Sequence, residues 1–288
     1  MLNRHIIGDN LLLTLARLAG PPFFSSSIET PPYSDHLTQT EITLPAFAGE
    51  RKYEAALHTL AGRLDTDFSV YRWKSENDPV LIYNMGGAEN PFDKTLKNMY
   101  PEPDDAPGTL IAVRSPCQRN LKELKVAFQH FNTYVAMVAA TTLLNEKIRA
   151  WLPGSGRART AISGTSLGGF ITNRHRLAFN TADAYIPFVA GARHGDIFLT
   201  SIAASKQARA NPDLIRSRLN FDGEWRNAFN GAHNVFPVNG AYDRLNRREM
   251  QGPSYAPVEP EYWPGGHLYA YNRPQRMRAK IERCWLAG

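Results

Sequence analysis

The chain has 288 residues, of which 43% are hydrophobic and 21% are charged, with a formal net charge of +6 and a pI near 9.3. This composition excludes a mainly disordered, collagen-like or disulfide-stapled chain, and the length suits one α/β domain. The only cysteines, Cys117 and Cys284, are too few for a disulfide framework or a four-thiolate metal site. We therefore expect a folded protein of a reducing compartment, the cytoplasm.

The first 36 residues are predicted to form a segment of their own. The apolar run Leu11–Ala16 is flanked by Asp9 and Arg17 and is too short to span a bilayer. We interpret this stretch as a short helix packed on the body, and we expect no transmembrane segment. Residues 21–36 hold four prolines and four serines, which favour an irregular arm. The arm is a candidate contact for a homodimer.

Residues 37–288 are predicted to form the main domain, because strand-like apolar runs alternate there with helical stretches. This pattern is typical of a mostly parallel sheet covered by helices on both faces. Helices are expected at 121–151, after Ser166, at 197–230 and near 51–64. The predicted strands are Glu41–Leu44, Phe68–Trp73, Val80–Asn84, Thr109–Val113, Thr160–Ser163, Ala184–Ala190 and Val235–Val238.

The basic C-terminal stretch Arg273–Lys280 is interpreted as the solvated face of a terminal helix. No zinc-finger, RNP or helix-turn-helix spacing accompanies the positive net charge, so we expect no nucleic-acid partner. No His-Glu-x-x-His, Gly-Lys-Ser/Thr or calcium-loop motif is present either, and we predict no bound metal.

A candidate nucleophile, Ser166, follows a predicted strand in the sequence Gly164-Thr165-Ser166-Leu167-Gly168. A serine on a sharp strand-to-helix turn needs small residues two positions before and after it, and both are glycine here. A helix beginning at Leu167 presents its backbone N–H to an oxyanion. Because three fixed positions match by chance in roughly one chain in ten, the motif needs support from elsewhere in the sequence.

That support comes from an acid and a histidine later in the chain. A serine hydroxyl is a poor nucleophile unless a histidine base lies beside it and a carboxylate orients that histidine. Asp243 lies in the loop after the predicted strand that ends at Val238, and His267 lies in a glycine-rich loop near the C-terminus. The order Ser, Asp, His is the one that α/β-hydrolases use.

From about Tyr71 to its end, the sequence therefore resembles the α/β-hydrolase family. Gly164–Gly169 resembles the nucleophile elbow of that family, Gly240–Arg244 its acid loop and Gly265–His267 its histidine loop. The resemblance implies an α/β-hydrolase fold and no cofactor.

Roles for individual residues follow from the same resemblance. Ser166 is expected to be the nucleophile, His267 the general acid and base, and Asp243 the orienting carboxylate. The second oxyanion donor of the family comes from a loop after an early strand, which here matches Gly87, with Gly86 as the alternative. Where the family usually has a histidine before these glycines, this sequence has a methionine.

Other residues compete for these roles. Asp196 follows an earlier predicted strand and is the alternative acid, while His194 and His233 adjoin predicted strand ends and rival His267. His130 and His175 are interpreted as helix-packing or surface residues, and Cys117 as a buried or half-buried thiol.

The stretch 197–232 lies where this fold carries a helical lid or cap. Phe198, Leu199, Trp225 and Phe229 are candidate walls of an acyl pocket there, although core packing would equally explain their spacing.

We expect hydrolysis of a carboxylic ester in a small-molecule acyl substrate through an acyl-enzyme. Thioester, peptide and lactone substrates need the same machinery, so the triad does not define the subtype. Two hypotheses from other functional classes stay open. The protein is an inactive hydrolase fold that serves as a binding protein, or it acts at an anionic surface through its basic tail.

Overall fold

A single sheet runs through the computed structural model, which describes residues 7–9, 14, 21–154, 158–228, 234–268 and 273–287. Within these residues the sheet has nine strands in the order β1-β2-β3-β5-β4-β6-β7-β8-β9. Three pairs at one end, β1/β2, β2/β3 and β3/β5, are antiparallel, and the other five pairs are parallel. The strands are Glu41–Thr43 (β1), Lys52–Thr59 (β2), Gly62–Arg72 (β3), Val80–Asn84 (β4), Thr109–Val113 (β5), Thr160–Thr165 (β6), Ala184–Phe188 (β7), Val238–Gly240 (β8) and Glu261–Trp263 (β9).

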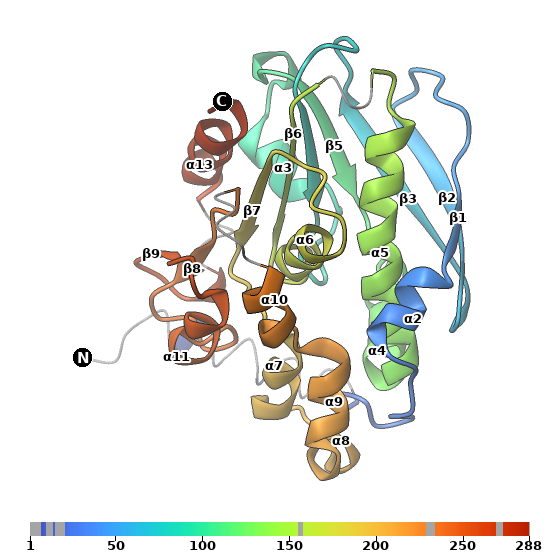
Figure 1. Cartoon of the computed structure of the whole chain (residues 1–288), viewed down its shortest axis with the longest axis vertical. Coiled ribbons are helices and arrows are strands. Elements are labelled where there is room, and N and C mark those ends of the chain that lie inside the picture. Colours follow the sequence, from blue (N-terminus) through green and yellow to red (C-terminus); the bar gives the residue numbers. More distant parts are fainter. Residues whose placement is uncertain are drawn as a thin grey trace.

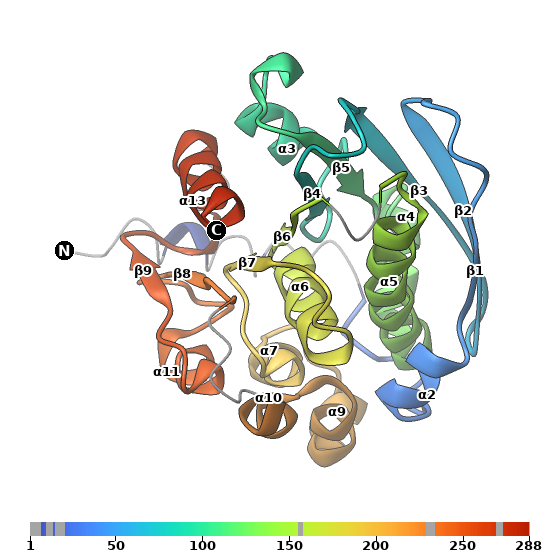
Figure 2. The ribbon, with the colours of Figure 1, turned by 45° about the horizontal axis from the view of Figure 1, so that its top comes forward.

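Helices cover both faces of the parallel part of the sheet. Helices α3 and α13 lie on one face and α5 and α6 on the other (Figure 2). Strands β4 to β7 are consequently buried at every residue, which is the environment that continuous apolar runs specify. The helices are Tyr33–Thr38 (α2), Lys94–Met99 (α3), Leu121–Gln129 (α4), Phe131–Trp151 (α5), Leu167–Ala178 (α6), His194–Thr200 (α7), Lys206–Ala210 (α8), Pro212–Leu219 (α9), Asp222–Ala228 (α10), Arg248–Gln251 (α11) and Pro274–Leu286 (α13), with short 3₁₀ turns at Pro103–Asp105 and Pro253–Tyr255.

The strand order places the candidate site at one edge of the sheet. The chain passes from β4 to β5 on one side and then crosses back through α4 and α5 to β6 on the other side. The carboxyl ends of β4 and β6 are therefore neighbours, with Asn84 paired to Gly164. Such a reversal of strand order leaves a crevice beyond the strand ends, where α/β proteins place their sites.

The helix predicted near 51–64 is wrong. This stretch forms most of the hairpin β2–β3, in which Leu57 pairs with Leu64. Along β2 the side chains of Tyr53, Ala55 and Leu57 are buried and those between them are more exposed, which is the period of two of a strand. The alternation was present in the sequence, but the Ala and Glu residues between the buried positions resembled a helix.

The prediction of a single long helix at 121–151 is wrong in one respect, because His130 divides this stretch into α4 and α5. The His130 backbone is extended, with φ −110° and ψ 106°. The arm causes this interruption. Ser27 forms an isolated β-bridge with His130, and the Ser27 carbonyl accepts the N–H of Phe131 at 3.1 Å. A contact with residues about 100 positions away thus replaces the helical hydrogen bond there.

The arm is irregular from Pro21 to Pro32, as its prolines predict, but its last four residues belong to helix α2 (Tyr33–Thr38), and the irregular part is well packed. Phe24 is fully buried and its ring contacts Phe131 at 4.6 Å and Phe198 at 4.8 Å between centroids. Phe23 forms an isolated bridge with Ala204. The arm therefore lies between α5 and the helices that follow β7. Of residues 1–20, those at 7–9 and 14 are helical, and the rest of the predicted helix lies outside the described residues.

The stretch predicted as helical at 197–230 contains α7, α8, α9 and α10, which group beyond one end of α6 (Figure 1). Residues 229–233 lie outside the described residues. Its role as a lid stays a prediction. The strand predicted at Val235–Val238 begins later, because Val235 makes only an isolated bridge with Tyr185 and β8 starts at Val238.

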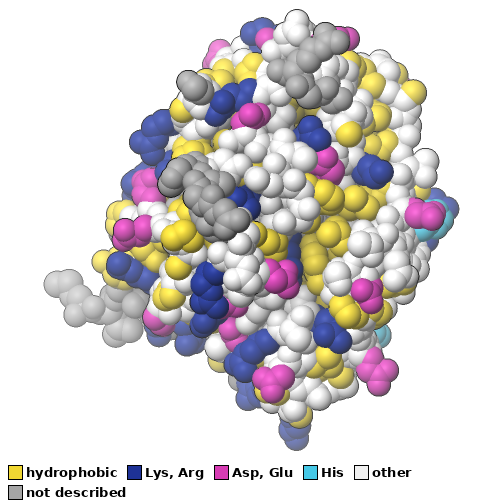
Figure 3. Space-filling view, in the orientation of Figure 1, with side chains coloured by type: hydrophobic (Ala, Val, Ile, Leu, Met, Phe, Trp, Pro, Cys, Tyr) yellow, Lys and Arg dark blue, Asp and Glu magenta, His cyan; other side chains and the backbone are white. Residues whose placement is uncertain are grey.

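The basic C-terminal stretch forms the start of α13, with Met277 and Ile281 buried against the sheet. On the outer side, Lys280 contacts the Glu261 carboxylate at 2.9 Å, and Arg276 lies over a tryptophan ring. Figure 3 shows Lys and Arg side chains interspersed with Asp and Glu side chains on the face in view. No helix among the described residues is long and apolar enough to cross a membrane.

Candidate active site

Ser166 occupies the turn between β6 and α6 in a conformation that few non-glycine residues adopt. Its φ is 55° and its ψ is −114°. A positive φ places Cβ close to the backbone of its own residue and costs about 1–3 kcal/mol, so the surroundings must hold it there. The Ser166 N–H donates to the Phe188 carbonyl at 2.9 Å, and the Ser166 carbonyl accepts the N–H of Phe170 at 3.0 Å. The turn is thus fixed to β7 on one side and to α6 on the other.

The two glycines of the motif are required by close backbone contacts. A Cβ on Gly164 would lie 2.5 Å from the Gly168 carbonyl, and a Cβ on Gly168 would lie 2.2 Å from the Asn84 carbonyl oxygen. These approaches bring the first turn of α6 directly onto the end of β4. As a consequence, the loop that follows β4 and the N-terminus of α6 lie side by side next to Ser166.

His267 bridges Ser166 and Asp243. The Nε2 atom of His267 lies 3.0 Å from Ser166 Oγ, and its Nδ1 atom lies 2.8 Å from Asp243 Oδ2. With the proton on Nδ1, the ring donates to the carboxylate and its Nε2 lone pair accepts the serine proton. His267 is 3% exposed and Asp243 4%, whereas Ser166 is half-buried, so the hydroxyl is the most accessible of the three groups.

The Asp243 carboxylate is held by its own loop. Its Oδ1 atom accepts the backbone N–H groups of Leu245 and Asn246, both at 2.8 Å, which leaves Oδ2 for the histidine. The Asn246 side chain donates to the carbonyl of Val189, directly beyond β7. Sequence reasoning missed Asn246, because its contact with Val189 forms only when the chain is folded.

The charges around His267 favour its protonated form. Burial by itself lowers the pKa of the imidazole, but the charge and hydrogen bond of Asp243, together with the charge of Asp9, outweigh it and raise the pKa above its ordinary value. A base with this environment is stabilised at the moment it receives a proton from Ser166.

The candidate oxyanion donors lie on the two segments that meet at Ser166. Leu167 is the first residue of α6, where a backbone N–H has no carbonyl partner within its own helix. The Gly86 N–H donates to Glu89 Oε2 at 3.1 Å, so this group already has an acceptor. Gly87 is exposed, and a Cβ added there would meet no atom within 4 Å. The hydrogen bonding thus favours Gly87 over Gly86.

Similarity to known proteins lies in the structure and not in the sequence. No protein-family model matches this sequence, and no curated protein matches it either. Acetyl xylan esterase 1 from Thermoanaerobacterium sp. is similar with a TM-score of 0.52 at 10% identity over 89% of this chain and 96% of that one. S-formylglutathione hydrolase (FrmB) from Staphylococcus aureus is similar with a TM-score of 0.54 at 13% identity over 85% and 99%.

An acylaminoacyl peptidase from Pyrococcus horikoshii is also similar, with a TM-score of 0.52 at 12% identity. This chain matches it over 86% of its own length but over only 48% of that longer chain. The topology and these likenesses agree. The chain has the α/β-hydrolase fold. The predicted fold class is therefore confirmed.

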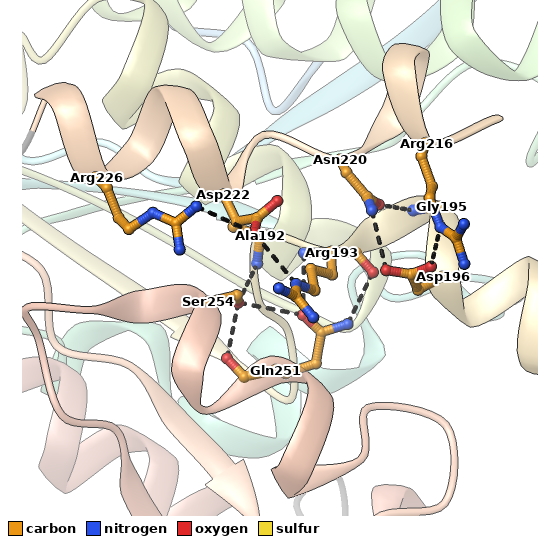
Figure 4. A network of polar contacts seen from close by, with 10 residues as sticks. All are labelled: Ala192, Arg193, Gly195, Asp196, Arg216, Asn220, Asp222, Arg226, Gln251 and Ser254. Carbon is orange, nitrogen blue, oxygen red and sulfur yellow. Dashed lines mark hydrogen bonds and ion pairs between the residues drawn. The ribbon is translucent and has the colours of Figure 1, made fainter. Parts of the chain in front are cut away.

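Within this α/β-hydrolase fold, the alternative acid Asp196 is engaged elsewhere. Its carboxylate accepts from Arg216 Nε at 2.8 Å and from Asn220 Nδ2 at 3.0 Å, in a polar network between α7, α9 and the loop after β7 (Figure 4). The same network ties Gln251 to the backbone of Arg193. Asp196 thus has a structural ion pair, and Asp243 is the carboxylate beside His267.

The rival histidines have structural contacts. His194 is buried, stacks on Phe170 with ring centroids 4.0 Å apart, and has its Nε2 atom 2.8 Å from the Tyr134 hydroxyl. Burial lowers the pKa of His194 to about 3, so its ring is neutral. His175 is buried near Glu146, and His233 lies outside the described residues.

The predicted acyl-pocket walls separate into two groups. Trp225 packs against Tyr255 in the core and does not belong to the cluster that contains Leu167. Phe198 is buried in that cluster, with Leu199 packed against it, while Phe229 lies outside the described residues. Core packing therefore explains Trp225.

The Cys117 thiol is disfavoured as an alternative nucleophile. Burial and the nearby Glu123 raise the pKa of the Cys117 thiol to about 11, which disfavours a thiolate nucleophile. No group of three or more His, Cys, Asp or Glu side chains in the described part of the chain is arranged to hold a metal ion.

Proposed function

We propose that this protein is a serine hydrolase that cleaves a carboxylic ester through an acyl-enzyme. The observation that carries the proposal is the continuous hydrogen-bonded series from Ser166 through His267 to Asp243, with Ser166 at φ 55° on a strand-to-helix turn. A buried carboxylate, an imidazole and a hydroxyl in this order form the arrangement that activates a serine nucleophile once the imidazole is neutral.

In the first half-reaction, Ser166 Oγ attacks the ester carbonyl carbon while its proton passes to Nε2 of His267. The carbonyl oxygen becomes an oxyanion, which accepts from the N–H groups of Leu167 and Gly87. The tetrahedral intermediate collapses, the C–O bond to the alcohol breaks, and the imidazolium gives its proton to the leaving alcohol. The acyl group then remains on Ser166.

In the second half-reaction, water replaces the alcohol. His267 takes a proton from the water, the resulting nucleophile attacks the acyl-enzyme, and a second tetrahedral intermediate collapses to release the carboxylic acid. His267 returns the proton to Ser166 Oγ. Asp243 stays ionised throughout and keeps the imidazole in the required orientation.

The likeness to two esterase-type proteins and a peptidase supports acyl transfer as the reaction class. Acetyl xylan esterase 1 acts by its name on an acetyl ester, and S-formylglutathione hydrolase by its name on a thioester. Since the same machinery cleaves both bonds, we propose an ester substrate with a thioester as the alternative.

The test is hydrolysis of a panel of p-nitrophenyl esters and matched thioesters with acyl chains of increasing length. We expect the wild-type protein to release p-nitrophenol with a burst of one equivalent when deacylation is slow, and we expect Ser166→Ala to be inactive yet folded. An Asp196→Asn variant serves as the control with an unchanged profile. Full esterase activity in folded Ser166→Ala would overturn the proposal.

A further inference from the structure

The strongest unassigned feature near the site is a buried carboxylate from the other end of the chain. Asp9 is 1% exposed and lies in a helical stretch, Ile7–Asp9. Its Oδ2 atom accepts the backbone N–H of His267 at 2.9 Å and the backbone N–H of Arg244 at 3.1 Å. One oxygen thus joins the residue after Asp243 to His267 itself, across more than 230 positions of sequence.

The histidine loop is shaped to admit this carboxylate. A Cβ on Gly266 would lie 2.6 Å from Asp9 Oδ2 and 2.8 Å from Oδ1. Any other residue at 266 would therefore push the carboxylate away from the N–H groups that it accepts. Burial of a carboxylate is costly unless N–H groups or cations compensate it, so an acid at this position needs a reason beyond packing.

Other contacts also hold the two loops, because the Ala241 N–H donates to the Trp263 carbonyl at 2.8 Å and the Asn246 side chain donates to the Val189 carbonyl. Strands β8 and β9, from which they leave, have three residues each, and β9 is at the end of the described sheet. The loops contact each other through the Tyr242 N–H and the Gly265 carbonyl, at 2.9 Å. The two hydrogen bonds that Asp9 accepts are charge-assisted, and bonds of this kind are stronger than neutral ones. Asp9 thus ties the backbones of Arg244 and His267 to a single oxygen atom.

We propose that Asp9 is a positioning residue of the active site, which locks the acid loop and the histidine loop together and so holds His267 in line with Ser166. Asp9 contacts neither substrate nor the reacting atoms. It acts through the backbone of His267, and its role in the reaction rests on the proposed function. The N-terminal segment thereby becomes a part of the catalytic apparatus.

The test compares Asp9→Ala with Asp9→Asn, because an amide oxygen keeps one acceptor where the alanine has none. Asp35→Ala, which removes another carboxylate of the N-terminal region, is the matched control. Since a displacement of about 1 Å can lower a rate about 100-fold, we expect Asp9→Ala to lower kcat roughly 10- to 100-fold at unchanged KM. Asp9→Asn should restore most of the kcat, and Asp35→Ala should match the wild-type protein.

Hydrogen–deuterium exchange supplies a readout that needs no activity. The peptides that hold Arg244 and His267 should exchange faster in Asp9→Ala than in the wild-type protein, with no change in Asp35→Ala. If Asp9→Ala does not fold, Gly266→Ala displaces the carboxylate from the opposite side and should give the same loss of kcat. The two substitutions should not be additive, because they break one contact.

The outcomes separate the two proposals. If the wild-type enzyme is active and Asp9→Ala keeps the wild-type kcat and hydrogen-exchange rates, the positioning role alone is overturned. A well-folded wild-type protein that hydrolyses no ester or thioester overturns the proposed function, and the positioning role falls with it. Faster exchange together with a lower kcat in Asp9→Ala, restored in Asp9→Asn, supports both.

Discussion

The turn that carries Ser166 and the two loops that carry Asp243 and His267 are held by different means. The turn is built from consecutive residues, since β6, the turn and α6 all lie within Thr160–Ala178, and its two glycines permit close packing within this stretch and against the end of β4. The two loops instead leave strands of three residues and are joined by Asp9.

The difference shows which half of the site a continuous stretch of sequence can specify. A strained serine turn can be specified locally, because strand, glycines and helix all determine the same geometry. The position of an imidazole relative to that serine depends on groups that converge from three parts of the chain. We therefore expect substitutions in the turn to alter folding, and substitutions around the loops to alter catalysis in a protein that still folds.

The largest effect on catalysis is expected from Asp243→Asn. An amide in this position cannot stabilise the imidazolium and favours the wrong tautomer, which costs about 10⁴-fold in kcat in serine proteases. Asp196→Asn, which removes the charge that pairs with Arg216 and alters the hydrogen bond from Asn220, should keep kcat near the wild-type value because neither partner lies at the site. Steady-state kinetics of the two purified variants make the comparison. The opposite ranking would show that Asp196 is the functional acid.

A smaller loss is expected when one oxyanion donor is removed. Gly87→Pro deletes the N–H that we assign to the oxyanion, and loss of one such donor lowers kcat by about 10²- to 10³-fold. Gly87→Ala keeps the N–H, and its Cβ meets no atom within 4 Å, so it should stay active. Equal kcat values for the proline and alanine variants would remove Gly87 from the mechanism.

The close packing of the turn against β4 is tested through stability. Gly168→Ala places a Cβ 2.2 Å from the Asn84 carbonyl oxygen, and overpacking of this kind costs about 1–3 kcal/mol. Gly223→Ala, in the exposed first turn of α10 with no atom within 4 Å, should unfold at the same or a higher denaturant concentration. Urea unfolding curves measure both. A Gly168→Ala variant as stable as Gly223→Ala would show that the turn is not tightly packed.

The smallest expected effect is a displacement of the pH profile. His267 must be neutral to accept the serine proton, and its pKa is raised because Asp243 and Asp9 outweigh the effect of burial. The specificity constant kcat/KM should therefore rise with pH through a midpoint above 6.5, the ordinary pKa of histidine. Asp9→Asn removes one of the raising charges and should move the midpoint to lower pH. A wild-type midpoint at or below 6.5 would contradict this environment.

Sequence patterns predicted the parallel part of the fold well. The strands at Val80–Asn84 and Thr109–Val113 have the expected bounds, because continuous apolar runs between turn signals have few other solutions. The prediction of a helix at 51–64 was wrong, because the alternation of buried and exposed side chains in β2 points to a strand only when a half-buried antiparallel sheet is assumed. The break at His130 depends on a bridge to Ser27, and the sequence of the helix itself does not contain it.

The candidate site divides in the same way. Ser166, Asp243 and His267 were selected by motif and order, and the fold brings His267 within hydrogen-bond distance of both Ser166 and Asp243. Asp9 entered the sequence reasoning only as a charge beside an apolar run, because nothing local distinguishes an acid that caps two distant backbone N–H groups. Partners of this kind become visible only when the chain is folded.

Labelling with a fluorophosphonate probe tests the central claim, that His267 activates Ser166, most directly. Intact mass and peptide mapping of the wild-type protein should show one adduct, on Ser166, and none in Ser166→Ala. Labelling should be strongly slowed in His267→Ala. A folded wild-type protein that stays unlabelled, or an adduct on another residue, would contradict the account.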